Sequence, residues 1–256
     1  SDVRSRRTAA GLPADPTDVE LEILAQTWSE HCKHKIFAAE IEYTDENGAK
    51  RRIDGLFKQY VKATTDEVAK RVDWLVSVFH DNAGIIKFDD NWNFALKAET
   101  HNSPSALDPY GGAITGIVGV NRDVLGAGMG CRCIFNTDVF CFASPFFDGD
   151  IPSRLMHPRR VLRGVHQGVK DGGNQSGIPD LNGAIVFHDR FLGKPLVFCG
   201  TGGMIPALVA GKPSHEKTAS PGDYIVMCGG RIGKDGIHGA TFSSEELHEG
   251  SPATAV

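Results

Sequence analysis

The sequence has no long hydrophobic run and few cysteines. No apolar stretch reaches the roughly 18 residues of a transmembrane helix, and the amino-terminal residues lack the apolar segment of a secretory signal. Six cysteines in 256 residues are too sparse for a disulfide scaffold. We therefore expect a soluble, cytoplasmic protein with reduced thiols.

The sequence also lacks an excess of positive charge. Lys and Arg total 27 and Asp and Glu total 32, so the net charge is −5 with neutral histidine. Such a chain is a poor general binder of nucleic acid or of an anionic membrane, and we expect neither as a partner. Apolar residues make up 41% of the chain, which is enough for a packed core. The 30 glycines have no collagen period and indicate tight turns or close approach of the backbone to a ligand.

The length predicts one large or two small domains. We expect a loose arm over 1–16, a first domain over 17–143 and the start of a second over 150–256, because the composition changes at 143–152. Strands mixed with long helices indicate an α+β or mixed α/β fold. The chain does not begin with Met and its last residues close no element, so we expect a piece of a longer protein.

Local signals place several elements in the first domain. Thr17 and Glu20 form a capping box that predicts a helix, and Asn47-Gly48 predicts a hairpin turn after an extended segment over 36–43. A second capping box, Thr64 to Glu67, predicts a helix whose buried face continues to Phe79.

Further along the chain, the patterns predict mainly strands and one helix. A helix is expected to begin near Pro158 and to stop at 171–174. The expected strands cover 85–101, 112–122, 132–142, 184–188, 195–200 and 223–229.

The segment Phe94 to His101 (FALKAETH) carries the most informative chemistry. On a strand, Lys97, Glu99 and His101 share one face at intervals of about 6–7 Å. A lysine suits phosphate, a glutamate is a hard oxygen ligand for Mg²⁺, and a histidine moves protons near neutral pH. The alternative interpretation is a solvated strand face, since polar residues alternate on any half-exposed strand.

Arg122 and Asp123 end the apolar run over 112–122. Arg suits phosphate oxygens and Asp suits Mg²⁺, so the pair is a second candidate for binding a phosphorylated ligand. The alternative is a mutual surface ion pair worth about 0–1 kcal/mol.

His31, Cys32 and His34 lie close together in the segment SEHCKH. Zinc is one interpretation, but no second ligand pair has finger spacing and Cys131-Arg-Cys133 is too short for a knuckle. The plain alternative is a helix end with His31 or Cys32 in the core. The glycine clusters at 126–130 and 229–235 match neither the dinucleotide fingerprint nor the P-loop.

Five motifs together resemble phosphoribosylformylglycinamidine synthase, of the aminoimidazole ribonucleotide synthetase superfamily. They occur in the order of that family and are spread over most of the chain. The motifs are WSEHCKHK (28–35), KAETHNSPSALDPYGGA (97–113), NRD (121–123), DGGNQSGIP (171–179) and GGRIGKDGIHGATFSSEEL (229–247).

The resemblance implies a fold and an activity. The expected fold is a mixed sheet or half-barrel with packed helices, followed by the start of a second α/β domain. The expected activity, in purine biosynthesis, converts formylglycinamide ribonucleotide to formylglycinamidine ribonucleotide with ATP and Mg²⁺. The amide oxygen is activated as an iminophosphate, and ammonia comes from a glutaminase subunit or domain, with a small bridging subunit as a further expected partner.

The resemblance also assigns roles to residues. His31 and His101 would be catalytic, with His101 as the proton acceptor. The ATP contacts would come from His34 and Lys97, and the Mg²⁺ ligands would be Glu99 and Asp123. The substrate contacts would be Thr100, Asn102, Ser103 and Arg122.

This chain departs from the family in two respects. The family usually has a second histidine at the position of Ser103, which puts that substrate contact in question. The family chain is also longer, with two related halves whose barrel strands pair. We therefore expect this piece alone to be inactive or weak and to form a homodimer through exposed barrel strands.

Two alternatives stay open. The chain could come from a superfamily relative with another small acceptor, or it could be a noncatalytic nucleotide-binding or interaction fragment.

Overall fold

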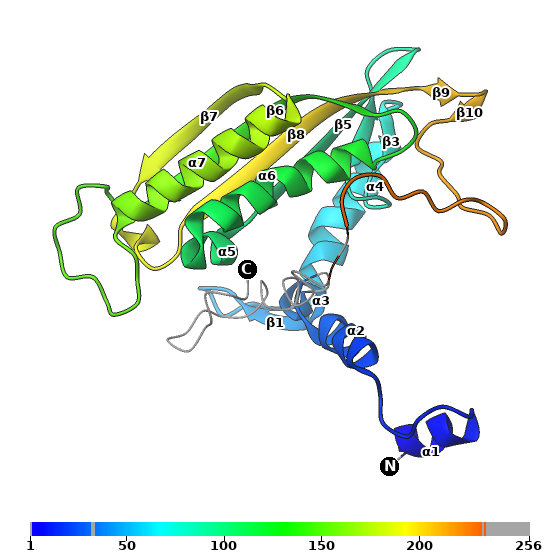
Figure 1. Cartoon of the computed structure of the whole chain (residues 1–256), viewed down its shortest axis with the longest axis horizontal. Coiled ribbons are helices and arrows are strands. Elements are labelled where there is room, and N and C mark those ends of the chain that lie inside the picture. Colours follow the sequence, from blue (N-terminus) through cyan, green and yellow to red (C-terminus); the bar gives the residue numbers. More distant parts are fainter. Residues whose placement is uncertain (1, 32–33, 232, 234–256) are drawn as a thin grey trace. The chain divides into compact units, whose positions relative to one another are not determined.

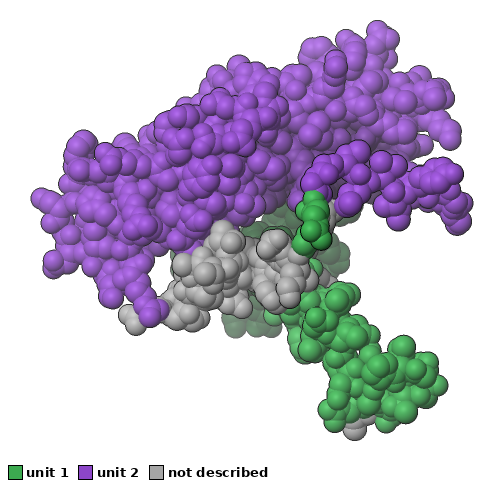
Figure 2. Space-filling view, in the orientation of Figure 1, with its two compact units in different colours: residues 1–64, 231–255 green, residues 65–230, 256 purple. Residues whose placement is uncertain are grey.

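The structure is a computed structural model that describes residues 2–31, 34–231 and 233. The described residues form two compact units, divided after Thr64 and again after Gly230 (Figure 2). Helix α4 (Ala63–Ala69) runs across the first division. None of the helices in these described ranges is long and apolar enough to cross a membrane.

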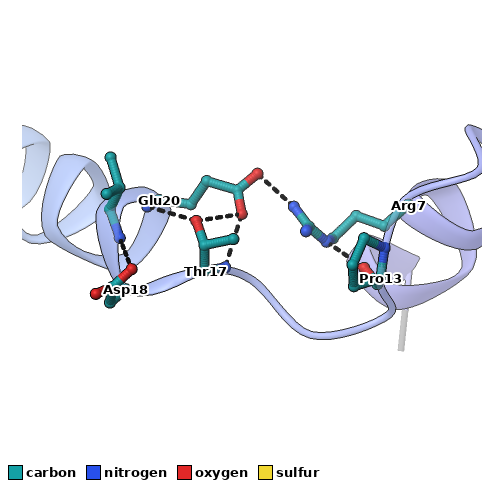
Figure 3. A network of polar contacts seen from close by, with 6 residues as sticks. Arg7, Pro13, Thr17, Asp18 and Glu20 are labelled. Atoms are coloured by element: carbon teal, nitrogen blue, oxygen red, sulfur yellow. Dashed lines mark hydrogen bonds and ion pairs between the residues drawn. The ribbon is translucent and has the colours of Figure 1, made fainter.

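The first unit begins with two helices tied together by an ion pair (Figure 3). The predicted capping box is confirmed: Thr17 Oγ1 accepts from Glu20 N at 3.2 Å, and the Glu20 carboxylate accepts from Thr17 N at 2.7 Å. Arg7 also pairs with Glu20, so α1 (Asp2–Ala9) is joined to the start of α2 (Asp18–Trp28). The loose arm expected over residues 1–16 is therefore partly helical.

The rest of the first unit is a short helix, a hairpin and a π-helical turn. Helix α3 (Lys35–Ala38) occupies part of the segment expected to be extended. The hairpin of β1 (Glu40–Thr44) and β2 (Lys50–Asp54) has its predicted turn, with Gly48 at φ 80°. The π-helical turn is η1 (Phe57–Lys62).

The helix predicted to begin at Thr64 begins earlier. Thr64 Oγ1 donates to the carbonyl of Tyr60, four residues earlier, at 2.7 Å. Thr64 therefore lies inside a helical segment and does not cap the start of a helix. The helix ends at Ala69, and Leu75–Ser77 form strand β3, where the sequence predicted a continued helical face.

The second unit is built on a six-stranded mixed sheet with two long helices, α6 (Pro109–Leu125) and α7 (Pro158–Ser176), across one face (Figure 1). The strand order is β3-β4-β5-β8-β6-β7; β6 and β7 are parallel and the other neighbours are antiparallel. The predicted α+β class is confirmed. The remaining elements are β4 (Gly84–Lys87), β5 (Trp92–Thr100), α5 (Asn102–Leu107), β6 (Arg132–Phe142), β7 (Asp180–Phe187), a 3₁₀ turn η2 (Asp189–Phe191), β8 (Leu196–Pro206), β9 (Leu208–Val209) and β10 (Lys212–Pro213).

The sheet does not stop at the expected domain boundary of 143–150. Strand β8 follows that segment in sequence but lies between β5 and β6, which precede it. The change in composition marks the connection between β6 and α7 within one unit, because pairing between distant segments leaves no trace in local composition.

The strand predicted over 112–122 is wrong, since these residues belong to α6. Asp108 caps the helix by accepting from Gly111 N at 3.1 Å, and Pro109 occupies its first turn. The buried residues Ile117, Val120 and Val124 recur at helical intervals of about three to four, a period that the glycines and β-branched residues obscured.

Two other local predictions are also wrong. Helix α7 does not stop at 171–174 but continues to Ser176, where Gly177 ends it at φ 68°. Residues 223–229 form no strand in the structure.

A stripe of three glycines lets α6 and α7 pack closely. A Cβ added at Gly164, Gly168 or Gly172 would lie 2.5 to 2.6 Å from an atom of α6. The helices and the sheet together enclose the larger core cluster, which includes Ile117, Val165 and Phe142.

The opposite face of the sheet is apolar and largely uncovered. Trp92 and Leu96 of β5 are exposed, and Phe94 stacks on Phe135 of β6 with ring centroids 6.2 Å apart. Met204 of β8 pairs with Phe94 across the strands and is only partly buried. An uncovered apolar sheet face of this kind is typical of a surface that another protein domain covers.

The glycine stripe generates a prediction about stability. Gly168→Ala should destabilise the protein by about 1–3 kcal/mol, because its Cβ would meet the backbone oxygen of Tyr110. Gly173→Ala in the same helix is the matched control: its nearest neighbour lies at 3.9 Å, so the gain in helix propensity should leave it as stable as the wild type or more so. Denaturant unfolding of both variants measures the difference, and equal midpoints would contradict close helix packing.

Candidate functional site

Strand β5 places alternate side chains under helix α6. Asn93 and Ala95 are buried on this face, and Lys97 and Glu99 follow on the same face as the strand approaches its end. The strand parity derived from the sequence agrees with this arrangement. The charged residues Lys97 and Glu99 therefore face the helix, and the large apolar residues Trp92, Phe94 and Leu96 face away from it.

The Lys97 ammonium lies between two carboxylates. Its Nζ is 3.0 Å from Asp123 Oδ2 and 3.3 Å from Glu99 Oε2. Burial by itself would lower the pKa of Lys97, but the hydrogen bond and charge of Asp123, together with the charge of Glu99, outweigh burial and raise this pKa above its usual value. Lys97 is thus a fixed cation at the centre of the cluster.

Asp123 is brought to this cluster by the last turn of α6. Its side chain is 10% exposed, and its second oxygen accepts from Asn82 Nδ2 at 3.3 Å. A carboxylate near a helix carboxyl end is opposed by the helix dipole, and the Lys97 ammonium offsets that cost. Arg122, the adjacent residue, is exposed, so the two charges do not form the surface pair considered as the alternative.

His101 follows β5 and stands at the start of α5. Its Nδ1 is hydrogen-bonded to the carbonyl oxygen of Gly112 in α6. A carbonyl only accepts, so Nδ1 carries the proton and the lone pair of the neutral ring lies on Nε2. The ring is therefore held in the tautomer that can accept a proton at Nε2.

The predicted substrate contacts do not all join this cluster. Thr100 has the strand parity opposite to Lys97 and Glu99 and is exposed. Asn102 Oδ1 accepts from Val197 N at 2.8 Å, which fixes the end of β5 to β8. Ser103 is buried, with 6% of its surface exposed.

His31 and His34 lie in the first unit, and the structure does not place them relative to the cluster in the second unit. Both are exposed. The His34 ring meets Phe37 edge-on at 5.8 Å and lines a cavity of about 580 Å³ beside the hairpin. Cys32, between the two histidines, lies outside the described residues.

A buried triangle of amides and a hydroxyl beside the cluster was missed by the sequence analysis. Asn136 Nδ2 donates to Asn121 Oδ1 at 2.8 Å and to Thr201 Oγ1 at 2.7 Å, and Thr201 Oγ1 donates to Asn121 Oδ1 at 2.7 Å. Lys97, Thr201 and Asn136 are register partners across β5, β8 and β6. The triangle therefore holds α6, through Asn121, directly over the strand row that contains Lys97.

Asp138 of β6 is a second buried group that the sequence analysis did not single out. It is 3% exposed, and among the described residues no donor other than a weak contact from the Cys199 thiol reaches its carboxylate oxygens. Burial raises its pKa to about 7. Burial, followed by the charge of Asp138, also raises the pKa of the neighbouring Cys199 thiol. The parity of β6, which puts Asp138 on the face of Phe140 and Phe142, is the signal that could have found it.

Oxygen donors for a hard cation are present in the cluster. Glu99 and Asp123 converge on one cationic group at 3.3 and 3.0 Å, and carboxylates are the donors that Mg²⁺ prefers. Within the described part of the chain, no group of three or more His, Cys, Asp and Glu residues is placed to hold a metal.

Burial and the neighbouring Cys133 raise the pKa of Cys131 to about 11, which keeps this thiol protonated.

Residues 80–205 match the family model described as AIR synthase related protein, N-terminal domain, and residues 3–35 match the formylglycinamide ribonucleotide amidotransferase linker domain. The six-stranded sheet with α6 and α7 is therefore a domain of the AIR synthase class.

The chain is 35% identical over 240 residues to phosphoribosylformylglycinamidine synthase subunit PurL of Thermoplasma acidophilum. This match covers 92% of the chain and 27% of that relative. The structure of T. maritima PurL complexed with FGAR superimposes with a TM-score of 0.62 at 29% identity, over 98% of this chain and 33% of that one. T. maritima PurL complexed with AMPPCP gives 0.56 at 27% identity, over 95% and 32%. The chain belongs to the phosphoribosylformylglycinamidine synthase family, and it spans about a third or less of these relatives.

The buried carboxylate of Asp138 generates a prediction about pH. Its pKa is raised from the usual value of 3.8 to about 7, so between these pH values the folded protein binds a proton that the unfolded chain has lost. Its contribution to stability is complete below pH ~4 and falls by up to roughly 4 kcal/mol as the pH rises through 7. Asp138→Asn should remove this decline, so the variant should gain stability relative to the wild type between about pH 5 and 8.

Urea unfolding of the wild type and variant at a series of pH values measures this difference. The matched control is Asp148→Asn, at an exposed position. It should follow the wild type at every pH. A stability difference between Asp138→Asn and the wild type that does not change with pH would contradict a protonated, buried Asp138.

Proposed function

We propose that the full-length protein catalyses the ATP-dependent conversion of formylglycinamide ribonucleotide to formylglycinamidine ribonucleotide. The observation that carries this proposal is the Lys97 ammonium held between the carboxylates of Glu99 and Asp123, in a chain that superimposes on PurL structures described with FGAR and with AMPPCP. The reaction class is carbon–nitrogen ligation in purine biosynthesis.

In the proposed reaction, the amide oxygen of the substrate attacks the terminal phosphoryl group of ATP and ADP leaves. Ammonia then adds to the activated carbon, loses a proton, and phosphate departs to give the amidine. The charge that develops on the transferred phosphoryl oxygens has to be neutralised by fixed cations.

Lys97 supplies one such cation and contacts a phosphate of ATP in this proposal. Glu99 and Asp123 hold Mg²⁺, which supplies further positive charge when it is bound. With both ligands bound, the Lys97 ammonium would contact a phosphate, and the Glu99 and Asp123 carboxylates would hold the divalent ion in place of the ammonium. The cluster thus contains one cation for a phosphate and two carboxylates for a divalent ion.

His101 is proposed as the proton acceptor through Nε2, because the bond from Nδ1 to the Gly112 carbonyl fixes this tautomer. Arg122, exposed at the end of α6, is proposed to contact the substrate. Asn102, which bonds to β8, and Ser103, which is buried, would shape the first turn of α5 beside the substrate. We propose that Thr100, the last residue of β5, contacts the substrate.

The first unit supplies the other proposed residues. We propose that His31 acts near the reacting amide and that His34 contacts ATP, as their motif implies. The segment that contains them carries the amidotransferase linker match, which supports a partner that supplies ammonia from glutamine.

The uncovered face of the sheet is the proposed place of a further partner. Trp92, Phe94, Leu96 and Met204 would pair with the equivalent strands of a second, related domain or of a second copy, which would close a barrel. This partner would bury apolar area that a free sheet leaves in water.

The proposed role of Lys97 generates a prediction about activity. Lys97→Met in the full-length protein should lower kcat/KM for ATP by about 100-fold or more, because the variant loses the fixed cation. Asp123→Asn should raise the Mg²⁺ concentration for half activity about tenfold or more. Steady-state turnover of formylglycinamide ribonucleotide with ammonia as nitrogen donor measures both effects.

Lys87→Met is the matched control. Lys87 is also paired with a carboxylate, Asp90, at 2.8 Å, but on the surface of β4. Its turnover should equal that of the wild type. Normal turnover by Lys97→Met and by Asp123→Asn would refute the assigned roles, and a folded protein active on another acceptor but not on this substrate would refute the proposed function.

A further inference from the structure

A groove along the first half of α7 is lined by three arginines. Its volume is about 780 Å³, and its lining includes Arg159, Arg160 and Arg163 together with His157 and His166, with no carboxylate residue. The net charge of the whole chain is −5, so this concentration of positive charge runs against the general composition. Lys97, Glu99, His101 and Asp123 do not line the groove, which makes it separate from the cluster described above.

Hydrogen bonds fix the side chains of Tyr110, Gln167 and Arg159 in the lining of the groove. Asp171 accepts from the Tyr110 hydroxyl at 3.2 Å and from Gln167 Nε2 at 2.8 Å, which holds both polar side chains in place. Arg159 Nε donates to the carbonyl of Pro145 at 3.0 Å, and its guanidinium lies over the Phe146 ring at 5.6 Å.

His157 caps the helix at the end of the groove. Its Nδ1 accepts from Arg159 N at 3.1 Å, so Nε2 carries the proton and donates to the carbonyl of Phe147 at 3.2 Å. The groove therefore has a pre-formed rim, which lowers the conformational entropy that the protein's side chains lose when a ligand binds.

Of the three arginines that line the groove, Arg160 and Arg163 are the two whose guanidinium groups make no bond within the described structure. They lie three residues apart on one helix face and are exposed. In the part of the chain that the structure describes, neither side chain has an ion pair or hydrogen bond. No acidic residue occupies the first turn of α7. Like charges at this spacing repel each other, and cations near a helix amino end oppose the dipole, so an anion placed here would relieve both costs.

We propose that this groove binds a small molecule that carries a polyphosphate group, at a site distinct from the Lys97 cluster. Guanidinium groups recognise phosphate oxygens through paired, charge-assisted hydrogen bonds, and Arg160 and Arg163 can both donate to one chain of phosphates. The volume falls within the range of about 300–1,000 Å³ that is usual for small-molecule sites, which favours a small ligand over an acidic protein segment. Tyr110 and Gln167 would contact the part of the ligand next to the phosphates.

The experiment is calorimetric titration of the full-length protein with inorganic tripolyphosphate, carried out in the Lys97→Met background. That background weakens the proposed nucleotide site, so the further loss of affinity caused by the arginine substitutions reports on the groove. Adding Arg160→Gln and Arg163→Gln together should raise the Kd for tripolyphosphate about tenfold or more. The matched control removes two other exposed arginines, Arg71→Gln with Arg190→Gln, and should leave the Kd within about twofold of its background.

Three results would overturn the proposal. The first is no tripolyphosphate binding in the Lys97→Met background, since binding would then belong to the cluster. The second is an equal loss of affinity in the arginine pair and in the control pair, which would mean a diffuse charge effect. The third is a deca-glutamate peptide that binds through Arg160 and Arg163 when tripolyphosphate does not, which would identify an acidic protein segment as the occupant. Circular dichroism of each variant verifies that α7 stays folded.

Discussion

The close packing of α6 on the centre of the sheet is the constraint on which the candidate site depends. Asp123 belongs to a helix and Lys97 to a strand, and they meet at 3.0 Å only because the helix lies directly over β5 and β8. The buried triangle of Asn121, Asn136 and Thr201 joins the helix to two strands in the same row. A buried polar network whose members bond one another specifies one arrangement more strictly than apolar contacts do. The hydrogen bonds among Asn121, Asn136 and Thr201 thus help to fix the distances from the Lys97 ammonium to the carboxylates of Glu99 and Asp123.

The glycine stripe of α7 contributes to the same constraint from the other side. Gly164, Gly168 and Gly172 bring α7 against α6, and the two helices form one layer over the sheet. Two sites use this layer in different ways. The charged cluster lies beneath it, where α6 faces the strands, and the cationic groove lies on its outer surface, where α7 faces water. The same pair of helices therefore presents fixed charge to two separate environments.

Much of this arrangement could be predicted from local sequence, and the exceptions have physical causes. The alternation in β5 predicted the common face of Lys97 and Glu99, and a capping box predicted the start of α2, because both signals depend on neighbours in the sequence. Helix α6 was misread as a strand because its β-branched residues favour strands and its glycines weaken the helix signal, whereas its burial follows a helical period. The insertion of β8 between β5 and β6 has no local signal at all. Asp138 and the triangle were missed since burial of a polar side chain is decided by the elements that cover it.

The position of β8 has a consequence for how the molecule is made. Strands β5 and β6 are both adjacent to β8 and to no common neighbour besides it, yet β8 is not complete until residue 206. On the ribosome, the two earlier strands must therefore wait for more than fifty further residues, at about 5–20 residues per second, before the row that contains Lys97 and Asn136 can form. During this interval their unpaired edges are available to other chains, so this is the stage of synthesis at which chaperones would protect the nascent polypeptide.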